Sequence, residues 1–340
     1  MKSRLLVAAL LLGSFLPGLR AAAGAAPSSA APPPHRVALR FNLLNIPEIQ
    51  EPAETFVIIC YLQLGWRDPS LAFAGDAPRV LFEEEAEEKV KEMWRPNVQF
   101  ANQAAPADTH HTVLTIKPDG TVGYDREMQV SLGSDLELHG FPFDRQTLNI
   151  ELESFGYPTT ALMFDVDPAH VTLARSISLA QWRLGALHWR ASIEHDDLTE
   201  ADYHRVTVSV DVQRRAGFYV WQIFVPLFLL ITIASAVFFL PPGDLADRMN
   251  VVVTSLLTAV ALSYAVHGDL PKISYLTLVD RLFVVAYVFL GAKIAVMLWL
   301  KQTVESHPAR VEAINRRARL IFPTAYLLTN AALIAMSMRA

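Results

Sequence analysis

The sequence predicts an extracellular, all-β, immunoglobulin-like sandwich followed by a bundle of four transmembrane helices. Three observations carry this prediction. Short runs of alternating polarity fill residues 36–215, whereas most of the apolar surplus within a hydrophobic fraction of 52% lies after residue 216. The first 26 residues are typical of a secretory signal peptide, which directs the segment after it out of the cytoplasm.

The N-terminus has the three parts of a secretory signal. Basic residues precede an apolar run over residues 5–12, and small residues follow it. We therefore expect a signal peptide over residues 1–26, with cleavage between residues 23 and 26. Residues 27–35 are rich in Pro and Ala and are expected to form a linker, because they have no apolar pattern to bury.

Residues 36–215 predict about ten short strands, and strands at this spacing favour a sandwich of two sheets. The clearest alternating runs are residues 37–41, 55–64, 112–116, 128–132, 147–153 and 205–212. Residues 83–93 interrupt the pattern and predict a short, solvated helix. The single cysteine, Cys60, excludes an intramolecular disulfide, so the domain has to depend on its apolar core.

Residues 216–340 predict a transmembrane domain, because each of four apolar spans is long enough to cross a hydrocarbon layer of about 30 Å. The expected helices cover residues 217–240, 249–268, 280–300 and 318–338. Basic residues are most frequent in the connection after the third span: Lys301, Arg310, Arg316, Arg317 and Arg319. By the positive-inside rule this connection is cytoplasmic and both termini lie outside, as the signal peptide also requires.

The second span is apolar throughout but has one face of mixed polarity. Residues on this face recur at steps of three or four, which places them along one side of a helix: Asn250, Thr254, Leu257, Ala261, Tyr264 and Gly268. Asp247 precedes the span and Asp269 follows it. Two interpretations are open from these residues alone, a helix packed in a bundle with Thr and Ser as hydrogen-bonding groups, or a helix that lines an aqueous pore.

Several classes of function find no support in the sequence. The net charge of −5 includes no basic surface suited to nucleic acid. His110 and His111 are adjacent and would point to opposite faces of a strand, so they do not form a metal site. The chain has no G-x-S-x-G motif or other sign of a catalytic nucleophile. We therefore expect neither an enzyme nor a protein with a cofactor or a bound metal.

Phe141, Pro142, Phe143, Asp144, Arg145 and Gln146 form a motif that resembles the FPFD-x-Q signature of the pentameric ligand-gated ion channels, the Cys-loop receptor superfamily. The two cysteines that bracket this loop in animal members correspond here to Ser134 and Leu148, as in the bacterial branch. Trp94-Arg95-Pro96-Asn97 resembles another family motif, and Arg214 resembles the basic residue before the first membrane helix.

The resemblance covers nearly the whole mature chain. The stretch from Arg248 to its closing residue Pro271 is similar to the pore-lining helix of the family, and the short connection over residues 301–319 resembles that of bacterial members. The segments ELESF (151–155) and LPKISYLTLVDR (270–281) are most similar to the bacterial amine-gated type.

The resemblance implies a homopentamer around a central pore lined by the second helix. Asp247 would then form a ring of carboxylates at the cytoplasmic mouth, and Asn250 and Thr254 would offer oxygens to a partly dehydrated ion. Anion channels of the family usually carry Pro-Ala before the basic residue, whereas this chain has Ala246-Asp247 before Arg248. We therefore expect selectivity for monovalent cations, with Arg248 turned away from the axis.

The same helix is expected to hold the gate. Leu257, and closer to the outside Tyr264, would close the pore as an apolar constriction that expels water. The resemblance does not decide between these two positions.

The resemblance also implies a ligand site between subunits, enclosed by aromatic side chains. Tyr61 would come from one subunit, and Phe100, Phe155 and Tyr203 from its neighbour. Glu153 would point to the same side as Phe155, and a carboxylate among aromatic rings suits an organic ammonium ion. Gln99 stands where amine-gated relatives have a second carboxylate.

Coupling between the two domains is expected at the membrane boundary. The resemblance implies that Asp144 pairs with Arg214, beside Glu48 and Glu51 in the loop over residues 46–54 and beside the connection that begins at Pro271. A cis peptide bond at Phe141-Pro142 is compatible with a tight turn, since cis bonds are essentially confined to proline, and the sequence leaves the isomer open.

The expected function is a cation-selective channel of the bacterial inner membrane, surrounded by membrane lipids and opened by a small amine. Two alternatives stay open at this stage. Protons could open a channel of the same fold, through His267 and the acidic sandwich, since histidine changes charge at physiological pH. Alternatively, the chain could be a membrane-anchored sensor that conducts nothing.

Overall fold

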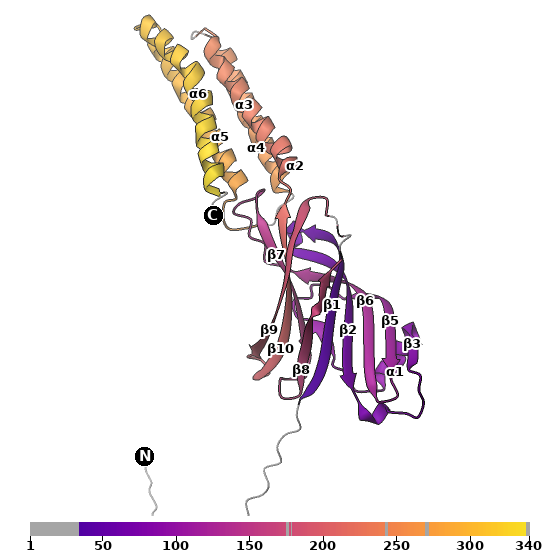
Figure 1. Cartoon of the computed structure of the whole chain (residues 1–340). Helices are drawn as coiled ribbons and strands as arrows, with labels where there is room; N and C mark the ends of the chain where they lie inside the picture. Colours follow the sequence, from indigo (N-terminus) through magenta and orange to yellow (C-terminus); the bar gives the residue numbers. More distant parts are fainter. Residues whose placement is uncertain (1–33, 175–176, 178, 242–243, 269–271, 338–340) are drawn as a thin grey trace, which may run out of the picture. The chain divides into compact units, whose positions relative to one another are not determined.

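The computed structural model describes residues 34–337, apart from 175–176, 178, 242–243 and 269–271. The expected signal peptide over residues 1–26 and most of the expected linker lie outside the described residues, as do Asp269 and Pro271. The described part consists of a β-sandwich followed by apolar helices (Figure 1), so the predicted fold class is confirmed.

The sandwich contains two sheets. The six-stranded sheet has the order β3-β5-β6-β2-β1-β8, with bounds β3 (Arg79–Phe82), β5 (Asp108–Ile116), β6 (Thr121–Gly133), β2 (Thr55–Arg67), β1 (His35–Gln50) and β8 (Leu162–Leu173). The four-stranded sheet has the order β4-β7-β10-β9, with bounds β4 (Val98–Phe100), β7 (Arg145–Ser154), β10 (Ala201–Arg214) and β9 (Trp182–Asp196). Neighbouring strands are antiparallel except β1 and β8, which are parallel.

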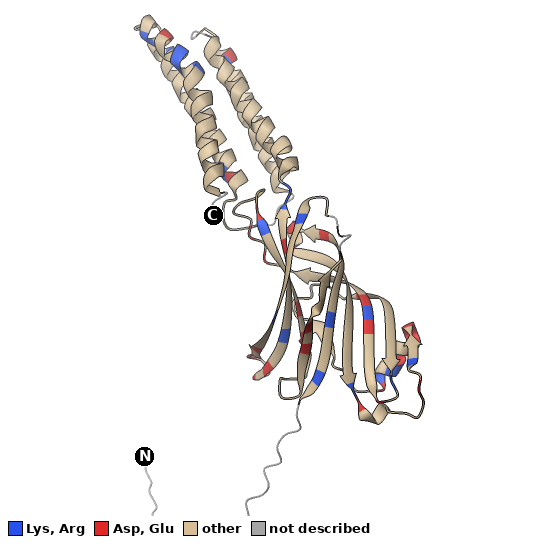
Figure 2. Cartoon of the chain, viewed as in Figure 1, with Lys and Arg blue, Asp and Glu red and all other residues tan. Residues whose placement is uncertain are grey.

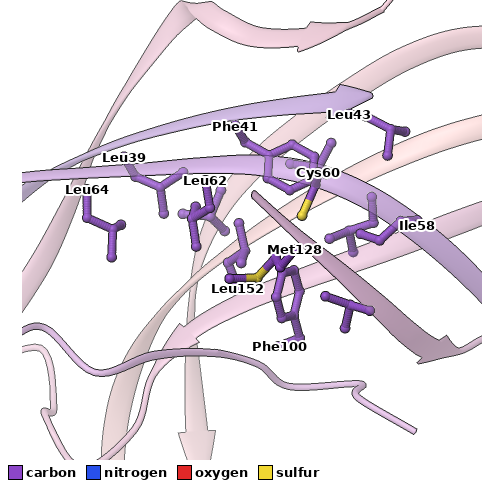
Figure 3. Close-up of a cluster of buried hydrophobic side chains, with 14 of the residues drawn as sticks. Leu39, Phe41, Leu43, Ile58, Cys60, Leu62, Leu64, Phe100, Met128 and Leu152 are labelled. Atoms are coloured by element: carbon purple, nitrogen blue, oxygen red, sulfur yellow. The ribbon is translucent and has the colours of Figure 1, made fainter. Parts of the chain in front are cut away.

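Alternating polarity builds the core between these sheets. Every second residue of β2 is buried, including Ile58, Cys60 and Leu62, because successive side chains of a strand point to opposite faces. Figure 3 shows these side chains packed against residues of the other sheet, such as Leu152. Burial raises the pKa of the Cys60 thiol to about 12, so the single cysteine is an unreactive member of the core.

Short helical turns complete the extracellular part. The predicted surface helix is α1 (Glu83–Lys91), which buries Ala86 and Val90 against the sandwich and leaves most of its charged residues exposed. Single 3₁₀ turns lie at η1 (Glu51–Ala53) and η2 (Pro69–Leu71), each with a proline at its start, where the missing N–H costs nothing.

Four helical spans in the described part are long and apolar enough to cross a membrane. The first, Gly217–Phe239, is composed of α2 (Gly217–Tyr219), a π-helical turn η3 (Val220–Phe224), α3 (Val225–Ser235) and a 3₁₀ turn η4 (Ala236–Phe239). The others are α4 (Leu245–His267), α5 (Leu278–Thr303) and α6 (Pro308–Ser337). Charged residues gather on the strands and near the helix ends, and the middle of the helices is almost free of them (Figure 2).

Two helices begin several residues before the predicted start. The second helix begins at Leu245 instead of residue 249, so Asp247 and Arg248 belong to its first turn. The last helix begins at Pro308 instead of residue 318. Its basic N-terminal part lacks the apolar character of a span but still forms a helix, since proline is favoured at the first helical position.

Candidate functional site

The polar face of α4 is exposed over its whole length. Asp247 and the six residues that the sequence assigned to this face are all exposed in the single chain: Asn250, Thr254, Leu257, Ala261, Tyr264 and Gly268. Leu257 is 65% exposed and Tyr264 78%, so neither packs into its own bundle. The opposite face is buried through Arg248, Val252, Ser255 and Ala259. The helix is therefore anchored by one face and presents the other.

Arg248 is the most completely buried charged residue at the base of this helix. Its side chain is 0% exposed, Nε donates to the carbonyl oxygen of Val237 at 2.8 Å, and Nη2 donates to Oδ1 of Asn315 at 2.5 Å. Asn315 and Arg319 of α6 in turn donate to the carbonyl oxygen of Phe238, at 2.7 and 2.9 Å. The guanidinium thus ties α4 to the end of the first span and to α6.

The proposed ligand residues on β4 and β7 lie together. Gln99 pairs directly with Glu153 across the two strands. Arg205 of β10, which the sequence did not single out, holds the Glu153 carboxylate through Nε at 3.0 Å and Nη2 at 2.7 Å, and its Nη1 donates to Glu151 at 3.1 Å. Burial lowers the pKa of Arg205, but its bonds with Glu153 and Glu151 outweigh this effect and raise the pKa above the ordinary value.

The aromatic residues predicted for this site lie on or beside different strands and differ in their exposure. Phe155 is 61% exposed just after β7, where Asn97 fixes the backbone by donating from Nδ2 to the Phe155 carbonyl at 3.2 Å. Tyr203 is nearly buried on β10. Tyr61 lies on β2 of the other sheet, where its cross-strand partners are Asn42 and Glu127.

Phe100 is a correction to the prediction. It is buried in the core (Figure 3), opposite Leu152 in the register of β4 and β7. Because Gln99 and Phe100 are consecutive in a strand, they point to opposite faces, and only Gln99 points to the side of Glu153. The Phe100 ring is therefore part of the sandwich interior.

The last strand ends in a buried ionic cluster at the boundary with the helices. Arg214 donates from Nε to Asp144 Oδ1 at 2.8 Å, from Nη2 to Asp144 Oδ2 at 3.2 Å and from Nη1 to Glu51 at 2.6 Å. Its side chain is 0% exposed and lies 4.1 Å from the ring centre of Trp182. Burial lowers the pKa of Arg214, but the bonds with Asp144 and Glu51 outweigh this and raise it. Glu48, three residues before Glu51, is exposed.

Gln146 explains the last position of the FPFD-x-Q motif. Its Nε2 donates to Asp144 Oδ2 at 2.8 Å and to the carbonyl oxygen of Glu137 at 2.9 Å, and its Oε1 accepts from the Glu137 N–H at 3.0 Å. The amide thus holds the Asp144 carboxylate toward Arg214 and closes the loop on itself. The peptide bond Phe141-Pro142 in this loop is cis, a point that the sequence left open.

The same loop contacts the start of α5. The Leu138 N–H donates to the Tyr275 hydroxyl at 3.1 Å, and the Leu278 N–H donates to the carbonyl oxygen of His139 at 3.0 Å. The His139 ring stacks on the Tyr275 ring with centroids 3.7 Å apart. These contacts connect residues about 137 positions apart in the chain, so local sequence patterns could not have revealed them. A cavity of about 810 Å³ lies beside them, lined partly by Arg145, Arg281 and Ser337.

The sandwich can also be compared with known protein families. Residues 23–216 match the neurotransmitter-gated ion-channel ligand binding domain. This match covers more than half of the chain, so the protein belongs to that family. Members of the family are ligand-gated ion channels that form pentamers and bind small ligands, and they are not enzymes. With its membrane-length helices, this chain is therefore a multi-pass ligand-gated channel protein of the Cys-loop family.

Relatives that are similar over most of this chain agree with this assignment. The chain is 27% identical over 294 residues to a proton-gated ion channel of Gloeobacter violaceus, which covers 85% of this chain and 79% of that protein. It is 24% identical to a gamma-aminobutyric acid receptor subunit beta-like protein of Drosophila melanogaster and to a gamma-aminobutyric acid receptor subunit beta of Lymnaea stagnalis. Each of these alignments covers 76% of this chain but only 54% of the animal protein.

Among the residues that the structure describes, no group of three or more His, Cys, Asp or Glu side chains is arranged to hold a metal ion.

Proposed function

We propose that the chain forms a homopentamer whose five α4 helices surround a pore selective for monovalent cations. The observation that carries this proposal is the contrast at the start of α4, where Asp247 is exposed and Arg248 is 0% exposed. A ring of five carboxylates concentrates cations and repels anions. A basic ring at the same level would have the opposite effect, and the burial of Arg248 removes that objection.

Other exposed residues of α4 have side chains suited to successive levels of such a pore. Asn250 and Thr254 offer amide and hydroxyl oxygens that can replace part of the hydration shell of an ion. Leu257 and Tyr264 offer apolar rings of side chains farther out, and either ring can form the gate. Both are mostly exposed, so their own bundle would lose little packing at these positions if the helix tilted.

For the ligand we propose a small organic amine that binds between neighbouring sandwiches. Glu153, Gln99 and the exposed ring of Phe155 lie at the candidate site of one subunit, and Tyr61 is proposed to face them from the next. Arg205 already neutralises Glu153, so the ammonium group of a ligand has to share this carboxylate or displace the guanidinium. Two relatives bear the name of receptors for gamma-aminobutyric acid, which carries a primary amine.

We propose the inner membrane of a bacterium as the location, with the bilayer lipids around the four spans and both chain ends outside the cytoplasm. The relative from Gloeobacter violaceus supports a bacterial setting. In this arrangement residues 1–26 are removed as a signal peptide, residues 36–215 form the periplasmic ligand-binding domain and residues 216–340 form the transmembrane domain.

Current recording from the purified protein in planar bilayers tests this function. A panel of small primary amines should open a cation current at neutral pH, with structurally matched alcohols as controls. A protein that stays silent with every amine and at every pH would be the non-conducting sensor, and the proposal would be wrong.

Opening by protons is the second candidate. It is favoured by the name of the Gloeobacter violaceus relative and by a contact between His267 and Asp280 at the outer end of α4. Stepping the bath pH without any amine separates the two stimuli, because only a proton-opened channel responds to that step alone.

A further inference from the structure

The last residue of α4 contacts a carboxylate in the first turn of α5. His267 Nε2 lies 2.6 Å from Oδ1 of Asp280, and His267 Nδ1 lies 2.6 Å from the carbonyl oxygen of Ser263. The His267 side chain is 48% exposed and that of Asp280 is 14% exposed. The contact therefore lies where solvent protons can reach the ring.

Both nitrogens of the His267 ring face oxygens that can only accept. A carbonyl oxygen and a carboxylate have no proton to give, so each of these short contacts requires an N–H on the imidazole. The Ser263 hydroxyl could donate to Nδ1, but it lies 3.4 Å away, much farther than the carbonyl oxygen. A neutral ring satisfies one of the two contacts and places two lone pairs against each other at the second. The geometry thus fits the doubly protonated, charged imidazolium.

Asp280 is held in place for this contact by the helix that it begins. Its Oδ2 accepts from the N–H and the hydroxyl of Thr277, both at 2.8 Å, and the Asp280 N–H donates to the Thr277 hydroxyl at 3.1 Å. This reciprocal capping box uses one carboxylate oxygen and leaves Oδ1 to His267. The acceptor is fixed before the histidine binds a proton.

Other charged groups nearby do not take the place of Asp280. Arg281, the next residue of α5, turns to the carbonyl oxygen of Leu276 at 3.2 Å. Lys272, in the connection between α4 and α5, is exposed. Within the part of the chain that the structure describes, Asp280 is the carboxylate paired with the His267 ring.

We propose that His267 is a proton-binding site that fastens the outer end of the pore helix α4 to α5. The N–H of Leu278, at the start of α5, donates to the carbonyl oxygen of His139. The site therefore joins α4 to the same segment that contacts the sandwich. Acid favours the fastened arrangement described here, and neutralisation of the ring releases it. The consequence for gating rests on the proposed channel function, whereas the proton site itself does not.

Chemical modification tests the site without any current. Of the two forms of an imidazole, diethyl pyrocarbonate acylates the neutral one and not the charged one. Mass spectrometry of the reconstituted protein reports the rate of acylation at His267. At pH 7 the rate should rise about two- to fivefold in Asp280→Asn, which corresponds to the loss of a partly exposed ion pair. Thr277→Val is the matched control, since it removes the capping hydroxyl but leaves Oδ1 for His267. Equal rates in the wild type and Asp280→Asn, or the same increase in Thr277→Val, would overturn the proposal.

Recordings then test the effect on gating. His267→Gln keeps an N–H for Asp280 but cannot titrate, so the difference in half-maximal amine concentration between pH 5 and pH 8 should shrink by about two- to fivefold relative to the wild type. An undiminished difference in His267→Gln would show that the site does not act on the pore. A protein that never conducts would contradict the channel function, while the modification rates would still decide whether the proton site exists.

Discussion

Asp247 and Arg248 are consecutive in the first turn of α4 and lie on different sides of it, one exposed and the other buried. Arg248 is buried among the carbonyl oxygen of Val237, the amide of Asn315 and the ring of Phe238, whereas Asp247 is exposed. Successive residues of an α-helix are rotated by about 100°, so one helix can anchor a cation inside the bundle and present an anion outside it. This arrangement is the basis of the proposed selectivity.

The gate can be located by two matched substitutions. Leu257→Ser and Tyr264→Ser each remove apolar surface that the subunit does not pack, so neither should prevent folding. The substitution at the gate should lower the half-maximal amine concentration about tenfold and produce a resting leak, because a polar ring no longer expels water from the closed pore. Two variants with the sensitivity of the wild type would exclude both residues as the gate.

The ionic cluster at Arg214 is expected to be essential for stability. Removing one member of a buried ion pair costs about 3–5 kcal/mol, because the remaining charge is left without a partner. Asp144→Asn should therefore lower the melting temperature of the purified protein strongly, and Glu51→Gln less, since Glu51 makes one bond to Arg214 where Asp144 makes two. If both variants lost a similar amount of melting temperature, the two bonds to Asp144 would stabilise the protein no more than the single bond to Glu51.

His204 is expected to make the stability of the sandwich depend on pH. Its Nδ1 accepts from the Phe164 N–H at 2.9 Å, and burial lowers the pKa of its ring. The unfolded chain, with a pKa of about 6.5 at this residue, therefore binds protons more readily than the folded chain. Stability falls as the pH drops below that value and is unaffected by this residue at higher pH.

The matched variant for this test is His204→Asn, whose side-chain oxygen can accept the same hydrogen bond but does not titrate. The loss of melting temperature between pH 7 and pH 5 should be smaller in His204→Asn than in the wild type. A loss of equal size in the two proteins would mean that other groups cause the acid sensitivity.

The amine site is tested by separating Glu153 from Arg205. Glu153→Gln should raise the half-maximal amine concentration about tenfold to a hundredfold, as expected for a hydrogen bond to a charged group. Arg205→Gln frees the carboxylate from its present partner and should lower that concentration. If Arg205→Gln abolishes the response and Glu153→Gln does not, the ligand binds through an anionic group and the amine assignment is wrong.

The sequence patterns predicted the architecture because the periodicity of burial is local. Alternation along residues such as Ile58, Cys60 and Leu62 follows directly from the strand, and the face from Asn250 to Gly268 follows directly from the helix. The start of α6 was placed ten residues too late because hydropathy marks the membrane-spanning part of a helix and not its amphipathic extension.

Contacts between distant residues could not be predicted in the same way. The partnership of Arg205 with Glu153, of Asn315 with Arg248 and of Tyr275 with Leu138 depends on which elements meet in three dimensions. The pairing of Asp144 with Arg214 was expected only from the resemblance to a family. Phe100 was misplaced because the resemblance pointed to the residue but did not determine which face of the sandwich its ring occupies.

The permeability ratio of the reconstituted channel tests the central claim most directly. The reversal potential is measured under a tenfold NaCl gradient for the wild type, for Asp247→Ala and for Glu305→Ala, which removes an exposed carboxylate from the connection between α5 and α6 as a control. The wild type and Glu305→Ala should reverse near the sodium equilibrium potential, and Asp247→Ala should lose about tenfold in its cation-to-anion ratio. A wild-type current that reverses near the chloride potential, or a ratio unchanged in Asp247→Ala, would contradict the account.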